Sequence, residues 1–293
     1  MKIEKVFIVG SGLMGAGIAQ VAASARLGVT VCDVNEAALE KAKKNIAWSV
    51  GKFIEKGKVQ GTVDEIMGRV AFTGEMAACA GHQLIIEAVF ENLALKQEIF
   101  AKLDAAADKD ALIASSTSAI SISELAAATK RPEKVLGLHF FSPVPMMAAV
   151  EVVRGMFTTD QVMEAGRAFA LAIGKEPIMV QKDVPGFLIN RINFPATLEA
   201  IRLVEAGVAT VEDVDKGLRL ASGRKMGIFE TGDMVGLEVT HGALLAIYEE
   251  TKDPRWFPPA TLRRKIAAGH VGKKAGKGWY LYDDQGNKVG MNT

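Results

Sequence analysis

A cluster of glycines near the N-terminus constrains this chain more than any other feature. The apolar run at residues 6–9 leads directly into Gly10, Gly12 and Gly15, and a helical pattern over residues 13–26 follows. The spacing G-x-G-x-x-G between a strand and a helix is the fingerprint of dinucleotide binding. Such glycines allow a tight turn, a close approach of the backbone to a pyrophosphate and close packing of helix on strand. The pyrophosphate is expected on the helix N-terminus, where free N–H groups favour an anion.

Asp33 bears on which dinucleotide would bind. It ends the second expected strand, 18 residues after Gly15. A carboxylate at this place can accept hydrogen bonds from the adenosine ribose and would repel a 2′-phosphate. No arginine follows at residues 34–36. The sequence therefore favours NAD over NADP, although the glycine motif alone also fits a glycine-rich turn without a ligand.

Short apolar runs alternate with helical patterns through the first 180 or so residues. This alternation predicts an α/β fold with parallel strands and crossover helices. We expect strands at residues 6–9, 29–32, 69–72, 84–86, 111–114, 135–138, 150–153 and 177–180, and helices at residues 13–26, 36–55, 92–107, 121–129 and 160–173.

The connection at residues 36–68 is longer than a simple crossover needs and predicts a helical insertion, broken near Gly57 and Gly61. Its lysines could bind a phosphorylated tail or form a solvated helix face. After residue 185 the pattern is helical, at residues 187–206, 211–221, 233–251 and 258–268, with a short strand pair around residues 279–282. We therefore expect an α/β domain at residues 1–184 and an all-α domain at residues 185–293.

Composition excludes several kinds of protein. Lys and Arg number 35 against 34 Asp and Glu, so there is no bulk charge to attract nucleic acid or a membrane surface. No apolar run exceeds six residues, and the N-terminus carries no signal-peptide pattern. Cys32 and Cys79 imply neither a disulfide framework nor a metal site. We expect a cytoplasmic protein with no nucleic-acid or membrane partner and no metal.

His139 is the most promising of four histidines. It ends the strand at residues 135–138, at the sheet edge where ligands usually bind. Glu151 follows twelve residues later in the strand at residues 150–153. A carboxylate beside an imidazole selects its tautomer and stabilises the imidazolium, which suits acid–base catalysis. A structural histidine and a surface glutamate would give the same spacing. Ser118 could reach a ligand, but no G-x-S-x-G elbow marks it as a nucleophile.

Several segments along the whole chain resemble the 3-hydroxyacyl-CoA dehydrogenase family, in particular its 3-hydroxybutyryl-CoA dehydrogenases. The resemblance lies in the order in which the segments occur. They are residues 10–17, Ile86-Glu-Ala-Val-Phe-Glu-Asn92 with Lys96, Ser116-Thr-Ser118, His139-Phe-Phe-Ser-Pro-Val-Pro145, Val150-Glu-Val152, Pro185-Gly-Phe-Leu-Ile-Asn-Arg191, Met226-Gly227, Asp233-Met-Val-Gly236 and Gly276-Lys-Gly-Trp-Tyr-Leu-Tyr282.

This resemblance implies a Rossmann-like N-terminal domain with a mostly parallel sheet, followed by an all-α C-terminal domain that forms a homodimer. It also implies NAD-dependent, reversible oxidation of an L-3-hydroxyacyl-CoA. The family's catalytic pair falls on His139 and Glu151, and its active-site serine and asparagine fall on Ser118 and Asn190, which also bind substrate. The implied cofactor-binding residues are Gly10, Gly12, Leu13, Met14, Gly15, Asp33, Ala88, Glu91, Lys96 and Ser118. The insertion contacts coenzyme A in the family, which implies a role for Lys52, Lys56 and Lys58.

The chain departs from the family at Ser142, usually Asn, at Ile228, usually Pro, and at Thr231, usually apolar. These departures leave acyl-chain preference open. Two other functions fit the same residues. One is a related dehydrogenase of a free hydroxy acid such as L-gulonate, and the other is a non-catalytic NAD-binding structural protein.

Overall fold

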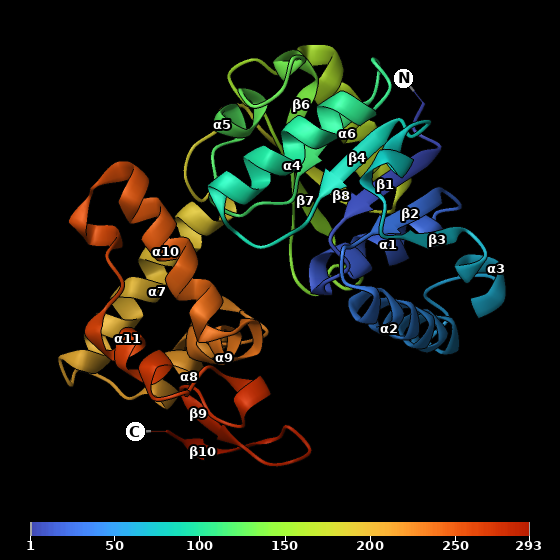
Figure 1. Ribbon diagram of the computed structural model, residues 1–293. Helices are drawn as coiled ribbons and strands as arrows, with labels where there is room; N and C mark the ends of the chain where they lie inside the picture. The colour runs from blue at the N-terminus through green and yellow to red at the C-terminus, as the bar shows by residue number, and fades with distance from the viewer. Residues whose placement is uncertain (1, 293) are drawn as a thin grey trace. The chain divides into compact units, whose positions relative to one another are not determined.

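The computed structural model describes residues 2–292, which divide in sequence after Phe187 into two compact units. Figure 1 shows both units along the colour ramp from blue to red. In this described part of the chain no helix is long and apolar enough to cross a membrane. Both cysteines are buried free thiols, and burial, with the neighbouring charge of Asp33, raises the pKa of Cys32 to about 11.

The first unit is built on one eight-stranded sheet with the strand order β3-β2-β1-β4-β5-β6-β7-β8. Each strand lies within two residues of its expected position, and the mostly parallel sheet is confirmed. The strands are β1 (Lys5–Val9), β2 (Gly28–Cys32), β3 (Val70–Thr73), β4 (Leu84–Glu87), β5 (Leu112–Ser115), β6 (Val135–Phe140), β7 (Ala149–Val153) and β8 (Glu176–Val180).

One strand pair breaks the parallel pattern. β7 runs antiparallel to β6, whereas every other neighbouring pair in this sheet is parallel. The chain between Phe140 and Ala149 contains no helix. A parallel crossover needs a dozen or more residues, so this short connection can only return the chain in the opposite direction.

Six helices flank or extend the sheet: α1 (Leu13–Ser24), α2 (Glu36–Glu55), α3 (Val63–Met67), α4 (Leu93–Ala106), α5 (Ile122–Ala126) and α6 (Asp160–Ala172). Short 3₁₀ helices lie at Met76–Cys79 and Pro132–Lys134. Side-chain caps set several helix starts, since Asn35, Asn92 and Thr159 each accept a hydrogen bond from the backbone of the first turn. The insertion consists of α2 and α3, and Gly57 and Gly61 between them both have positive φ.

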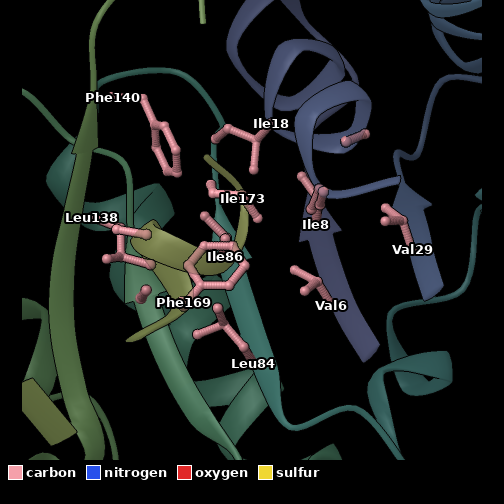
Figure 2. Packing of buried hydrophobic residues seen from close by; sticks show 14 of the residues in the cluster. Val6, Ile8, Ile18, Val29, Leu84, Ile86, Leu138, Phe140, Phe169 and Ile173 are labelled. Carbon is pink, nitrogen blue, oxygen red and sulfur yellow. The ribbon is translucent and has the colours of Figure 1, made fainter. Parts of the chain in front are cut away.

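Alternate residues of the strands face two separate apolar clusters, one on each side of the sheet. Val6 and Ile8 of β1 belong to the cluster that includes Ile18 of α1 and Phe169 of α6. Figure 2 shows these side chains packed together. Phe7 and Val9 join the second cluster, which also takes residues of α4 and α5. Burial on both faces explains why the strands are almost continuously apolar.

The second unit is helical, with one antiparallel pair of short strands. Its elements are α7 (Ile189–Glu205), α8 (Val211–Ser222), α9 (Ile228–Val235), α10 (Leu237–Thr251), α11 (Ala260–Ala267), β9 (Tyr280–Tyr282) and β10 (Lys288–Met291), with 3₁₀ helices at Pro254–Trp256 and Lys273–Ala275. This confirms the expected helical fold of the C-terminal part.

The single helix expected at residues 233–251 is wrong. Gly236 has a φ of +108° and separates α9 from α10. The first of these helices begins earlier than expected, because buried Asp215 accepts hydrogen bonds of 2.9 Å from the backbone N–H groups of Phe229 and Glu230. A carboxylate from the preceding helix, α8, thus caps α9, which the local apolar pattern could not indicate.

Candidate active site

His139 and Glu151 face each other on the antiparallel strands β6 and β7. The strand register places them directly opposite. Their side chains meet at 2.6 Å between Nδ1 of the imidazole and Oε2 of the carboxylate. The exposed fraction is 3% for His139 and zero for Glu151. Opposed residues of an antiparallel pair lie on the same face of the sheet, so the register itself forms this contact.

Ser118 lies at the other nitrogen of the imidazole. Its Oγ is 3.1 Å from Nε2 of His139. The ring also contacts Phe141 and Phe187, with centroid distances of 4.8 and 5.5 Å. A carboxylate can only accept a hydrogen bond, so Glu151 selects the tautomer with the proton on Nδ1. That tautomer leaves Nε2 free to accept a proton from a hydroxyl group.

The segment after β5 that carries Ser118 is held by Glu91. One carboxylate oxygen, Oε1, accepts hydrogen bonds from the Thr117 hydroxyl and from the backbone N–H groups of Ser118 and Ala119, the last two at 3.0 and 3.2 Å. The other oxygen, Oε2, lies 3.4 Å from Nζ of Lys96. Glu91 and Lys96 therefore support the segment that places the serine beside the histidine.

Sequence reasoning missed one further charged residue here. Glu87 ends β4 with no exposed surface, and it forms a 2.6 Å ion pair with Lys96, which is 1% exposed. The available signal was a carboxylate at the end of an otherwise apolar strand, nine residues before a lysine. A buried carboxylate requires a charged or hydrogen-bonded partner, so this pattern indicates that Glu87 pairs with a nearby cation.

The glycine turn between β1 and α1 fits a pyrophosphate. Gly10 has a φ of +101°, and a Cβ there would lie 2.6 Å from the carbonyl oxygen of Ala88. A Cβ on Gly15 would collide with the carbonyl oxygen of Gly10, whereas one on Gly12 would meet nothing within 4 Å. Gly12 caps α1 without a side-chain hydrogen bond, and the first turn has no acidic residue. Open space therefore lies beside helical N–H groups that can bind an anion.

Asp33 lies just beyond β2 and is held in place by the glycine turn. Its Oδ2 accepts hydrogen bonds from the backbone and hydroxyl of Ser11, at 2.9 and 2.7 Å, and its Oδ1 accepts one from the backbone of Asn35. Burial acts to raise the pKa of Asp33, but the hydrogen bonds from Ser11 and Asn35 outweigh it and hold the pKa below its ordinary value. An ionised carboxylate here fits a ribose diol and repels a phosphate.

The remaining expected site residues are more scattered. Leu13 is exposed and Met14 is half-buried in the first turn of α1. Lys52, Lys56 and Lys58 are exposed at the end of α2, where Lys52 pairs with Glu55 and Lys58 lies over the ring of Phe53.

Asn190 is half-buried in the first turn of α7, in the second unit, so its role beside Ser118 and His139 stays a prediction. Among residues 2–292 no group of three His, Cys, Asp or Glu side chains could hold a metal ion.

Comparison with known proteins gives a consistent result. The family model "3-hydroxyacyl-CoA dehydrogenase, NAD binding domain" matches residues 5–184, and the model for the C-terminal domain of the same family matches residues 186–282. A 3-hydroxybutyryl-CoA dehydrogenase of Mycobacterium tuberculosis is 42% identical over 282 residues, covering 96% of this chain and 99% of that protein.

Two further relatives extend the comparison. The mitochondrial hydroxyacyl-coenzyme A dehydrogenase of Homo sapiens is 39% identical over 289 residues, covering 96% of this chain and 91% of that protein. The crystal structure of FadB2 from M. tuberculosis matches with a TM-score of 0.93 at 42% identity, covering 97% of this chain and all of that one. The chain therefore belongs to the 3-hydroxyacyl-CoA dehydrogenase family and is an NAD-dependent dehydrogenase.

Proposed function

We propose that this enzyme catalyses the reversible oxidation of short-chain L-3-hydroxyacyl-CoA, above all 3-hydroxybutyryl-CoA, to the 3-ketoacyl-CoA. The observation that carries the proposal is the buried His139–Glu151 pair with Ser118 at the remaining imidazole nitrogen. Relatives at 36–42% identity that bear the name 3-hydroxybutyryl-CoA dehydrogenase support the choice of acyl chain.

In the proposed mechanism His139 acts as the general base of the oxidation. Its Nε2 accepts the proton of the C3 hydroxyl, while the C3–H bond breaks and the C3–O bond becomes a carbonyl. When bound, NAD would supply the hydride chemistry, accepting the C3 hydrogen with its bonding electron pair as a hydride in oxidation and donating a hydride in reduction. Glu151 balances the charge of the imidazolium that forms, and in the reducing direction the imidazolium returns the proton to the oxygen.

Ser118 and Asn190 complete the proposed substrate site. The Ser118 hydroxyl lies at the nitrogen that receives the proton, so it can hydrogen-bond the same substrate oxygen and direct it to His139. Asn190 is proposed to hydrogen-bond a second substrate oxygen. Together these contacts would hold C3 in a reactive orientation, which is a large part of what a dehydrogenase contributes.

The coenzyme A tail is proposed to lie along the insertion. Lys52, Lys56 and Lys58 are exposed at the end of α2, as phosphate-binding lysines must be. Because Lys52 already pairs with Glu55, Lys56 and Lys58 are the better candidates. We further propose a homodimer, which light scattering on the purified enzyme will test.

A panel of 3-ketoacyl-CoA thioesters of increasing chain length, assayed with NADH and NADPH, tests the proposal. We expect the fastest turnover with acetoacetyl-CoA and NADH, and competitive inhibition by free coenzyme A. Turnover of a free acid such as L-gulonate with no response to coenzyme A would favour a hydroxy acid dehydrogenase instead. Tight NADH binding without turnover of any thioester would favour a non-catalytic NAD-binding protein.

A further inference from the structure

Glu87 is a buried charge that the proposed mechanism does not use. It lies at the end of β4 with no exposed surface and accepts three hydrogen bonds. Oε1 accepts from Nζ of Lys96 at 2.6 Å and from the backbone of Val89 at 2.7 Å, and Oε2 accepts from Oγ of Ser115 at 2.7 Å. A buried ion pair of this kind often adds no stability over apolar residues of similar volume.

Two routes lead from Glu87 to Ser118. In the first, Lys96 contacts both Glu87 and Glu91, at 2.6 and 3.4 Å, and Glu91 accepts the backbone hydrogen bond of Ser118 at 3.0 Å. In the second, the Ser115 hydroxyl donates to Glu87 and accepts from the backbone of Thr117 at 3.2 Å. Thr117 immediately precedes Ser118, so both routes meet at the segment beside His139.

The charges along the first route explain why a carboxylate is needed at this place. The Lys96 ammonium is buried between two carboxylates, and Glu87 is the closer and more buried of the two. With Glu87 holding the ammonium, Glu91 keeps Oε1 for its three donors in residues 117–119. Without Glu87, Lys96 would have only Glu91 as a carboxylate partner and would draw it away from these donors.

We propose that Glu87 is a positioning residue for the dehydrogenase reaction. It acts through Lys96 and Ser115 to fix Glu91 and the segment at residues 117–119, and so holds the Ser118 hydroxyl at Nε2 of His139. This inference rests on the proposed roles of Ser118 and His139. The substitution Glu87→Gln keeps the shape of the side chain and removes the charge that holds Lys96.

Asp104 provides a matched control on the same helix as Lys96. It is a largely buried carboxylate of α4 and forms a 2.6 Å ion pair with Arg131. Its carboxylate accepts hydrogen bonds from the backbone of Lys130 and from Nε of Arg131, which precede the start of β6, whereas His139 lies near the other end of that strand. Asp104→Asn therefore removes a comparable buried charge from the same unit without touching either route to Ser118.

The experiment compares Glu87→Gln, Asp104→Asn and the unmodified enzyme at a temperature below all their Tm values. The readouts are Tm, the KM for acetoacetyl-CoA and the single-turnover rate of NADH oxidation with both substrates saturating. The Tm of both variants should be lower than that of the unmodified enzyme. Only Glu87→Gln should lose about 10- to 100-fold in rate, because misplacing a positioning group by about 1 Å can cost about 100-fold. Its KM for acetoacetyl-CoA should stay within about threefold, since the proposed coenzyme A contacts of the insertion are untouched.

A Glu87→Gln rate within about threefold of the unmodified enzyme would overturn the inference, as would an equal loss in Asp104→Asn. If Glu87→Gln does not fold, the rate of Ser115→Ala is measured instead, because this substitution removes the hydroxyl of the second route without removing a charge. An unchanged rate in Ser115→Ala would then reject the inference. Absence of turnover in the unmodified enzyme would instead reject the proposed function, so the two failures are distinguishable.

Discussion

Replacing Glu151 by glutamine should nearly abolish turnover while leaving the fold and substrate binding intact. The two side chains have almost the same shape, so β7 keeps its packing. The glutamine amide, however, can donate to Nδ1 of His139, which is 2.6 Å from the present carboxylate oxygen. Donation there selects the tautomer with hydrogen on Nε2, and such an imidazole cannot accept the substrate proton.

The size of the effect follows from the charges. In oxidation a buried imidazolium forms beside Glu151, whose Oε2 is 2.6 Å from Nδ1 of the ring. Each charge is spread over its group, so we take their centres as about 4 Å apart. At an effective dielectric constant of about 20 their attraction is about 4 kcal/mol, or about 1,000-fold in rate. This lies within the range of about 10²- to 10⁴-fold typical of general acid–base catalysis.

Steady-state reduction of NAD with L-3-hydroxybutyryl-CoA measures the loss, which should appear in kcat and leave both KM values within about threefold. Glu164→Gln is the control, because Glu164 forms an exposed ion pair with Arg167 on α6 and should be replaceable without effect. If kcat of Glu151→Gln stayed within about tenfold of the unmodified enzyme, neither the tautomer nor the charge balance would carry the reaction.

Three further predictions concern the dinucleotide. Asp33→Ser should raise the KM for NADH about 10- to 100-fold and lower that for NADPH, because it removes charged hydrogen bonds and a repulsive carboxylate. Since the pKa of Asp33 lies below its ordinary value, its contribution to NADH affinity should persist as the pH falls, and be lost only below that ordinary value. Gly12→Ala should leave the Tm unchanged and weaken NADH binding, because its Cβ enters the open space beside the helix N-terminus. Gly15→Ala should lower the Tm and also weaken NADH binding, because its Cβ strikes the backbone of Gly10. Titration of NADH fluorescence and thermal melts separate the two glycines, and equal behaviour would refute the assignment of their roles.

Much of the first unit could be predicted because its strands, helices and turns depend on residues that lie close together in the sequence. Eight apolar runs gave the strands, and the turn between β1 and α1 was readable from three glycines. The pairing of His139 with Glu151 was also within reach, since two strands joined by a short connection must lie side by side. The roles of these residues in the reaction stay predictions until the variants are measured.

The parts that escaped prediction depend on contacts between distant residues. Glu87 meets Lys96 and Ser115 only when β4, α4 and β5 have packed together. The start of α9 depends on Asp215, which belongs to another helix. Hydrophobic periodicity carries no information on such caps and networks, because their polar partners are chosen by the tertiary fold.

The antiparallel pairing of β6 with β7 has a consequence for how this chain can change. Side chains alternate between the two faces of a strand, so one residue inserted within β7 would turn Glu151 to the face opposite His139. Both residues would still be present in the sequence, but their side chains could no longer contact each other. Insertions and deletions in this hairpin should therefore damage the site more than many point substitutions would. The number of residues in β7 matters to the site as much as the identity of Glu151.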